Sequence, residues 1–231
     1  MKVGIMQPYF FPYLGYWQLI NAVDKYVVYD DVTFIKGGWI NRNNILLNGK
    51  KFLITLPLDN SSSFRNINEI ALIKHEGAVR KVLRTIETAY KKAPYFNTIM
   101  PIIEKLVLNN PTISLLNYNA ILEVNKYIGI DTEIILSSAL KKDNSLKAQE
   151  KVIHINKLLE SDTYINAIGG QSLYNEEEFN KNGLKLFFLK MGDVKYEQFG
   201  NEFIQGLSII DVLMFNDNIS IREYLDSYTL L

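Results

Sequence analysis

The sequence contains no cysteine and only two histidines, His75 and His154. Without cysteine the chain can form neither a disulfide bond nor a thiolate metal site, and a thioester intermediate on the protein is excluded. The two histidines are far apart in the sequence, and their neighbours favour a surface position for His75 and a structural position in a helix for His154. The sequence therefore predicts no metal site.

The chain also lacks an excess of charge and a long hydrophobic run. Lysine plus arginine and aspartate plus glutamate number 25 each, whereas general nucleic-acid binders usually carry a basic excess. No apolar run approaches the ~20 residues that a membrane-spanning helix needs, and the first run ends too soon for a signal peptide. We therefore expect a cytoplasmic protein with no membrane span and no general nucleic-acid binding.

A strand–loop–helix–strand pattern occupies residues 2–31. The apolar run 3–6 has the length of a buried strand, apolar residues recur at helical spacing over 14–23, and a second apolar run, 26–29, ends at Asp30–Asp31. This is the pattern of a βαβ unit. Ligands of open parallel sheets bind beyond the carboxyl ends of the strands, so we expect the functional site there.

Helical and strand patterns alternate in the rest of the chain. Asn48–Gly49 between apolar runs predicts a β-hairpin. Further helices are expected at 77–92, at 100–108 and from Thr112 or Ser114 to Gly129; strands at 133–136, 163–168 and 184–189; and helices at 146–159 with Ser145 as N-cap, from Ser172 or Asn175 to Phe179, at 208–215 and at 221–225. This predicts one α/β domain over 1–231 with a Rossmann-like parallel sheet, in which 45–128 forms a hairpin and helical insertion or cap.

The order of several motifs resembles that of one known family. The opening MKVGIMQPYFFPYLGYWQLINAVDKYVVYDDVTF, and then FIKGGWINRN, INAIGGQSLY and LSIIDVLMFN, are similar to segments of WbqC-like proteins. That family is associated with bacterial O-antigen (lipopolysaccharide) and other surface-polysaccharide gene clusters. The resemblance implies transfer of glycine or another amino acid to an amino sugar. One departure is visible: Lys36 is followed by Gly37–Gly38, where the family often has Lys-Arg, so the cations left are Lys36 and Arg42.

A second resemblance concerns the segment Pro12–Tyr16. Its place after the first strand is similar to that of the His-x-Gly-His signature of nucleotidyltransferases and class I aminoacyl-tRNA synthetases. In those enzymes the glycine lets a nucleotide approach, which is the role implied for Gly15. Tyr13 and Tyr16 replace the histidines; they can donate hydrogen bonds to phosphate but carry no positive charge. The resemblance implies nucleotide binding more than adenylation chemistry, and a fold-level analogy does not establish function.

The candidate catalytic residues are Asp30, Asp31, Gln7 and Tyr13. Asp30 or Asp31 would be the base for the amine proton, or would bind the sugar; Gln7 and Tyr13, with the amides of Gly169–Gly170, would stabilise an oxyanion. The competing interpretation is structural. In that case the aspartates end a strand, and the loop from Gln7 to Pro12 packs as a rigid aromatic loop beneath the helices.

The candidate substrate-binding residues form three groups. Arginine and lysine suit phosphate, tryptophan can stack on a base or sugar, and glycine amides at a helix start can bind anions. Alternatively, Trp39 anchors a solvated loop and Gly169–Gly170 make a tight turn. Ser208 and Asp211 are interpreted as a capped helix start with a structural role. The candidates are Tyr9, Phe10, Gly15 and Tyr16; Lys36, Trp39, Asn41, Arg42 and Asn43; and Gly169, Gly170, Gln171 and Tyr174.

These residues and the resemblance together predict aminoacyl transfer, with glycine as one candidate, to the amine of a nucleotide-linked amino sugar. The activated donor is left open between aminoacyl-tRNA, an adenylate made from ATP, and a carrier-bound thioester, so ATP or an activated aminoacyl donor is the cofactor expected. Two alternatives stay open. The chain is a non-catalytic nucleotide-sugar binder or assembly partner, or it is an ATP-dependent adenylate-forming or nucleotidyltransferase-like enzyme.

Overall fold

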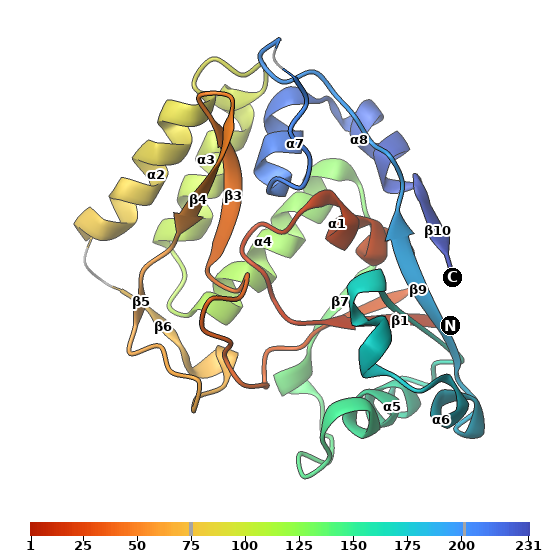
Figure 1. Cartoon of the computed structure of the whole chain (residues 1–231). Helices are drawn as coiled ribbons and strands as arrows, with labels where there is room; N and C mark the ends of the chain where they lie inside the picture. Colours follow the sequence, from red (N-terminus) through yellow and green to blue (C-terminus); the bar gives the residue numbers. More distant parts are fainter. Residues whose placement is uncertain (74–75, 201) are drawn as a thin grey trace.

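The computed structural model describes residues 1–73, 76–200 and 202–231, so His75 lies outside the described residues. A six-stranded sheet runs through this part of the chain in the order β10-β9-β8-β1-β2-β7 (Figure 1). The strands β1, β2, β7, β8 and β9 are parallel, and β10 pairs antiparallel with β9. The predicted α/β class with a mostly parallel sheet is confirmed. The strands are β1 (Lys2–Met6), β2 (Lys25–Val28), β7 (Glu133–Leu136), β8 (Thr163–Ala167), β9 (Lys185–Met191) and β10 (Tyr228–Leu230).

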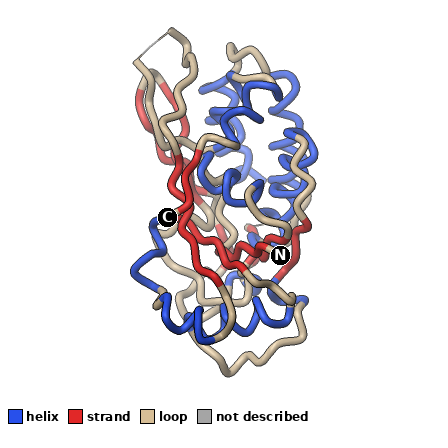
Figure 2. The backbone as a smooth tube through the Cα atoms, turned by 90° about the vertical axis from the view of Figure 1, so that its right-hand side faces the viewer, coloured by secondary structure: helices blue, strands red, loops and turns tan. Residues whose placement is uncertain are grey.

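Helices cover both faces of this sheet, and Figure 2 shows the strands between two groups of helices. The alternation of side chains along the strands explains this. Val3, Ile5 and Val27 pack with α5 (Ala148–Leu158) and α6 (Glu176–Lys181). Tyr26 and Val28 pack on the opposite face, in the cluster that includes α1 (Leu14–Asn21) and α8 (Asn218–Leu225). None of the helices in the described part of the chain combines the length and apolar character that crossing a membrane requires.

The chain between β2 and β7 stands beside the sheet, at the upper left of Figure 1. Its β3–β4 hairpin turns at Asn48 and Gly49, with φ of 52° and 69°, which is the turn that Asn-Gly predicts. Its buried residues belong to the same cluster as those of α1 and α8. The elements are β3 (Arg42–Leu47), β4 (Lys50–Thr55), β5 (Leu58–Asp59), η1 (Ile67–Glu69), β6 (Ala71–Leu72), α2 (Glu76–Tyr90), α3 (Phe96–Leu108) and α4 (Ile113–Ile128).

Most helix boundaries follow the sequence, with two corrections. Thr112, one of the two residues predicted as N-cap, caps α4, and Ser208 caps α7 (Ile209–Phe215), as predicted. The helix expected from residue 100 begins at Phe96, because backbone bonds to the Tyr95 carbonyl start it earlier and Pro101 is tolerated inside it. Ser145 does not cap α5; its hydroxyl donates to Asp143 instead, and the helix begins at Ala148.

The order in which the chain adds strands to the sheet reverses at β1: first β2 and β7 are added on one side, and then β8 and β9 on the other. The neighbours of β1 are β2, the next strand in the chain, and β8, a much later one. The loops that leave the carboxyl ends of β1, β2, β7 and β8 therefore meet along one edge, here called the carboxyl edge, which is where ligands of such sheets bind. The segments η2 (Ser137–Ala139) and η3 (Ile168–Leu173) follow β7 and β8 at this edge.

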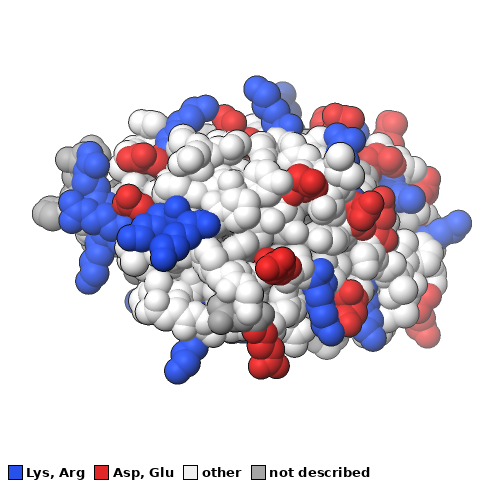
Figure 3. Space-filling model, turned by 90° about the horizontal axis from the view of Figure 1, so that it is seen from above, with Lys and Arg blue, Asp and Glu red and all other residues white. Residues whose placement is uncertain are grey.

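Charged side chains of both signs project from the surface, as Figure 3 shows for the face seen from above. A group of basic side chains gathers at the left end of that face, and elsewhere the two signs are interspersed. This agrees with the equal numbers of basic and acidic residues, 25 each.

Candidate functional site

The loop that follows β1 is held by side chains from distant segments. The Asn43 amide donates to the carbonyls of Phe10 and Phe11, at 3.0 and 2.8 Å. Asn117 donates to the carbonyl of Pro8 at 3.1 Å, and the Ser208 hydroxyl to that of Phe11 at 2.6 Å. The backbone of the loop is therefore fixed, and the side chain of Asn43 is occupied in fixing it.

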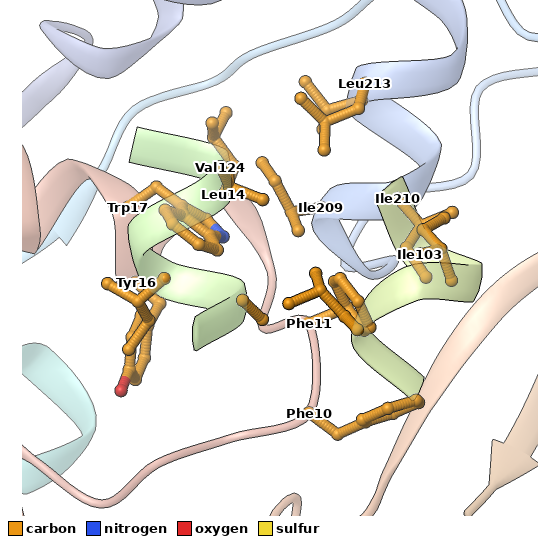
Figure 4. Packing of buried hydrophobic residues seen from close by; sticks show 14 of the residues in the cluster. Phe10, Phe11, Leu14, Tyr16, Trp17, Ile103, Val124, Ile209, Ile210 and Leu213 are labelled. Atoms are coloured by element: carbon orange, nitrogen blue, oxygen red, sulfur yellow. The ribbon is translucent and has the colours of Figure 1, made fainter. Parts of the chain in front are cut away.

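Phe11 has the left-handed backbone angle φ of 41°. A bulky residue in this region costs on the order of 1–3 kcal/mol and persists only where its surroundings hold it. Here its carbonyl accepts two hydrogen bonds and its ring is buried near Ile103 and Ile210 (Figure 4). The Phe10 ring is also in the core, with 0% of its surface exposed. Of the aromatic residues in this loop, Tyr9 is only half-buried.

The tyrosines around α1 differ in exposure. Tyr16 is buried, and its hydroxyl donates to the Gln7 carbonyl at 3.0 Å. Burial raises the pKa values of Tyr9 and Tyr13, so both are neutral at pH 7. A Cβ on Gly15 would lie 2.5 Å from the Tyr13 ring, so the glycine makes room for that ring. Tyr13 is partly exposed and lines a pocket beyond β9, together with Asp193, Tyr196, Phe203 and Gln205.

The polar segment 36–43 lies against the first loop, because the Trp39 carbonyl accepts from the Phe10 amide at 2.9 Å. Arg42 donates from Nε to the Gly38 carbonyl at 3.1 Å, and also to the Gly37 carbonyl. Asn41 donates to the Leu56 carbonyl at 2.8 Å. Lys36 and Trp39 are the members of this segment whose side chains are exposed to solvent.

Asp30 and Asp31 have different surroundings although they are adjacent. Asp30 is 1% exposed, and its carboxylate accepts from the Ser138 amide at 2.9 Å and from the hydroxyls of Ser138 and Ser114 at 2.7 and 3.2 Å. These bonds join the end of β2 to η2 and α4. Both oxygens of Asp30 are therefore occupied by the protein.

Asp31 forms ion pairs with two lysines. One oxygen, Oδ2, lies 2.7 Å from Lys142 Nζ and 3.3 Å from Lys151 Nζ. Burial acts to raise the pKa of Asp31, but hydrogen bonding to Lys142 and Ser137 and the charges of the two lysines outweigh burial, and its pKa lies below the ordinary value. Asp31 is therefore ionised at neutral pH. Lys151 also lies over the Tyr29 ring, 5.5 Å from its centroid.

The turn after β8 completes this part of the edge. Tyr164 and Tyr174 share a hydrogen bond of 3.1 Å between their hydroxyls, and the Asn166 amide donates to the Tyr174 hydroxyl at 3.2 Å. A Cβ on Gly170 would lie 2.7 Å from Asn166 Oδ1, so this glycine lets the turn approach the amide. Burial raises the pKa of Tyr29, and the nearby Asp31 and Tyr174 raise it further. Tyr29 therefore lies between the tyrosines of this turn and Asp31, which pairs with the two lysines.

The structure thus assembles a cluster of polar side chains, here called the edge cluster, at the ends of β2 and β8. Of the predicted residues, Asp31, Gly170 and Tyr174 belong to it. Gly169 and Gln171 are exposed in η3 beside it. Tyr13 instead lines the pocket beyond β9, and the segment 36–43 lies against the loop that follows β1. Among the described residues, no group of three or more histidine, cysteine, aspartate or glutamate side chains is arranged to hold a metal ion. The edge cluster consists of Tyr29, Asp31, Lys142, Lys151, Tyr164, Asn166, Gly170 and Tyr174.

Comparison with known proteins decides the family. The profile of the WbqC-like protein family matches residues 7–223. The chain belongs to the WbqC-like family. An uncharacterized protein of Mycobacterium tuberculosis (strain ATCC 25618 / H37Rv), Rv1507c, is 26% identical over 227 residues, which cover 97% of each chain. No solved structure matches the chain. The resemblance inferred from the motifs is confirmed, and the whole edge cluster lies within the matched residues.

Sequence reasoning missed the two lysines of the edge cluster in this member of the WbqC-like family. Lys151 carries a signal, because it precedes Ile155 by one helical turn and therefore shares the buried face of α5. A lysine at such a position is rarely buried unless it is paired. Lys142 carries no local signal, since it stands in an irregular segment between η2 and α5. Tyr29, Tyr164 and Asn166 were missed because residues of this kind in or next to a buried strand usually serve packing.

Proposed function

We propose that this protein transfers an aminoacyl group, such as glycyl, to the amine of a nucleotide-linked amino sugar bound at the carboxyl edge. The observation that carries the proposal is the edge cluster: hydroxyl, amide, ammonium and carboxylate groups gathered where the winding of the sheet reverses. Numbered along the chain, the parallel strands lie in the order 5-4-1-2-3. Read from the other edge, this is the order of the first five strands of Rossmann-type sheets, which bind nucleotides at the reversal point.

The reaction places definite demands on the site. The sugar's amine attacks the activated carbonyl carbon, a C–N bond forms, the bond to the leaving group breaks, and the proton that the amine loses passes to the leaving group or to water. Asp31 is our choice for the carboxylate that faces the substrate, because both oxygens of Asp30 are occupied. Its lowered pKa suits it to hold an ammonium or hydroxyl group of the substrate. Hydroxyl and amide groups of the cluster would orient the sugar.

The family and the exposed residues beside the first loop extend the proposal to the pathway, the donor and the distal part of the substrate. Family membership supports a role in the biosynthesis of O-antigen or another bacterial surface polysaccharide, where amino sugars are acylated. The donor would be an activated aminoacyl group, made with ATP or supplied by a carrier. Lys36 and Trp39 are exposed beside the first loop and would contact the distal part of a long substrate. Arg42 is committed to the carbonyls of Gly37 and Gly38, so we assign it a supporting role.

A mass-spectrometric assay tests the transfer. The pure protein is incubated with a set of nucleotide-linked amino sugars, glycine and ATP, and separately with activated glycyl donors. A gain in mass by one glycyl residue on the sugar is expected, and it should be strongly reduced in the Asp31→Asn variant. Sugar binding without any mass gain, across all donors, would overturn the transferase proposal. Release of AMP without transfer would instead indicate an adenylate-forming enzyme.

A non-catalytic nucleotide-sugar binder is the second candidate. It is favoured by one observation: both aspartates that follow β2 are already engaged, Asp30 by serines and Asp31 by lysines. In that case the edge cluster serves recognition only. Calorimetry with the same sugars separates the two candidates, because a binder shows affinity without turnover.

A further inference from the structure

We propose that Lys142 and Lys151, held together by Asp31, form a binding site for a small anionic group, a phosphate or a carboxylate. The site lies at the carboxyl end of β2, next to the turn after β8. It requires neither an amino sugar nor an acyl donor, so it stands independently of the transferase proposal. If that proposal also holds, this is where a charged part of the substrate or donor would lie.

The first argument is the balance of buried charge. The side chains of Lys142, Lys151 and Asp31 are 1%, 8% and 12% exposed. Burial of a charge costs several kcal/mol unless an opposite charge and hydrogen bonds compensate for it. One carboxylate compensates for one ammonium, so the cluster retains one buried positive charge. Among the described residues, Asp31 is the acidic group that forms an ion pair with either lysine.

The second argument is the number of hydrogen bonds. An ammonium has three donors. Lys142 donates to Asp31 and to the Ser137 carbonyl. Lys151 donates only to Asp31 among the described residues, at 3.3 Å, and otherwise contacts the face of Tyr29. The ring accepts part of the charge, but donors on Lys151 are left for another acceptor.

The third argument is the unused oxygen of Asp31. Both lysines bind Oδ2, whereas Oδ1 is buried and accepts no hydrogen bond of ordinary length from the residues that the structure describes. The Ser137 hydroxyl is also buried without a partner of ordinary length, and it lies near enough to Asp31 to lower the pKa of that carboxyl. A ligand with an anionic oxygen and a donor would satisfy both sides: the anion binds Lys151, and the donor binds Oδ1. A protonated phosphate fits this description, and so does an amino acid, which has a carboxylate and an ammonium group.

The neighbouring groups do not oppose an anion. Burial raises the pKa values of Tyr29 and Tyr174, so both phenols are neutral at pH 7 and add no negative charge. Asp30 is turned toward Ser114 and Ser138, and its bonds are satisfied there. The Tyr174 hydroxyl supplies a further polar contact on the side of η3. The site is therefore electropositive and lined with neutral polar groups.

Calorimetry with simple anions tests the site at constant ionic strength. The probes are inorganic phosphate, pyrophosphate, acetate and glycine, with chloride as the reference anion. We expect at least one probe to bind the wild-type protein, and we expect Lys151→Met to bind it about 10- to 100-fold more weakly, because a charge-assisted hydrogen bond is lost. Lys157→Met, at an exposed position on the same helix, is the matched control and should bind normally.

The pattern of binding identifies the ligand's chemistry. Binding of phosphate or pyrophosphate alone indicates a phosphate site, and binding of acetate or glycine alone indicates a carboxylate site. If none of the probes binds at millimolar concentration, or if Lys151→Met binds as tightly as the wild type, the proposal is wrong and the lysines only cross-link α5 to β2.

A second measurement on the wild-type protein removes any dependence on how the variants fold. Lysine ammonium resonances are followed by NMR as the anion is added. The Nζ signals of Lys142 and Lys151 should shift together and saturate, whereas those of exposed lysines should change little. Uniform small shifts over all lysines would contradict a specific site.

Discussion

Two aspartates in this molecule, the buried Asp211 and the largely buried Asp31, are held in different ways. Asp211 is 0% exposed and accepts from the hydroxyls of Tyr90 and Tyr196 at 2.8 and 2.7 Å and from the Gln198 amide at 2.6 Å. Its donors are neutral, and burial raises its pKa. The donors of Asp31 are ammonium groups, and its pKa is lowered.

The difference separates a carboxylate with a structural role from one that is a candidate for a functional role. Both oxygens of Asp211 are occupied, and they tie α7 to α2 and to the segment before residue 200. This agrees with the structural role expected for Asp211 from its place at the helix start. Asp31 has one oxygen that accepts no hydrogen bond of ordinary length from the described residues, although the Ser137 hydroxyl lies near it, and its other oxygen lies between two cations. Unused capacity for hydrogen bonding, more than burial, distinguishes the candidate site.

The largest effect is expected for Asp211→Ala. Three buried donors would lose their acceptor, and at ~1–3 kcal/mol for each unsatisfied group the free energy of unfolding should fall by roughly 4 kcal/mol. Urea denaturation followed by circular dichroism measures the change. Asp193→Ala, at an exposed site, is the control and should change stability by less than about 0.5 kcal/mol. A loss below about 1 kcal/mol for Asp211→Ala would show that the network is not structural.

A smaller loss, about 2–3 kcal/mol, is expected for Asp31→Asn. The substitution leaves two lysines without their counter-ion, but the group is partly exposed, which reduces the cost below that of a fully buried pair. The same denaturation experiment measures it. Addition of an anion that binds Lys142 and Lys151 should restore part of the stability that Asp31→Asn loses, because the anion replaces the missing counter-ion. An unchanged stability would mean that water already compensates for both lysines.

The two carboxylates should also give opposite dependence on pH. The folded-state pKa of Asp31 is lowered, so its contribution is present above the unfolded value of about 4 and is lost as the pH falls through the folded value. The pKa of Asp211 is raised, so its contribution is greatest below about pH 4 and falls as the pH rises through the folded value.

Stability curves from about pH 2.5 to 7 test this. The difference between wild type and Asp31→Asn should grow as the pH rises from about 2.5 to 4.5, whereas the difference between wild type and Asp211→Asn should shrink above about pH 4. Parallel curves for the two variants would remove the distinction drawn here between the sites.

The smallest effect is expected for a pair of glycine variants in η3. Gly170→Ala places a Cβ 2.7 Å from Asn166 Oδ1, so the amide must shift and disturb its bond to Tyr174; a cost of about 1–2 kcal/mol is expected. Gly169→Ala is the matched control, because no atom of another described residue lies within 4 Å of its Cβ. Melting temperature and anion affinity should both change for Gly170→Ala only. Equal effects would indicate that backbone preference, and not contact with Asn166, matters at this turn.

Sequence reasoning performed best where the signal is local. Asn48–Gly49 predicted the hairpin, Thr112 and Ser208 were recognised as helix caps, and the run of alternating strands and helices predicted the α/β class. Each of these depends on residues a few positions apart, whose backbone preferences act in the same way in any fold. The family could also be recognised from the sequence, because its motifs recur in order along the chain.

Tertiary structure alone decided how the candidate site is composed. Asp31 meets Lys142 and Lys151 across more than one hundred intervening positions, and only the pairing of β2 with β7 and the packing of α5 bring them together. The sequence identified Asp30 and Asp31 as a pair of adjacent carboxylates. In the fold, serine hydroxyls donate to Asp30, whereas two lysines form ion pairs with Asp31. Strand β10 was missed for the same reason, since its three residues become a strand only by pairing with β9. Local propensity selects the elements, whereas the partners of a buried polar group depend on which elements pack against it.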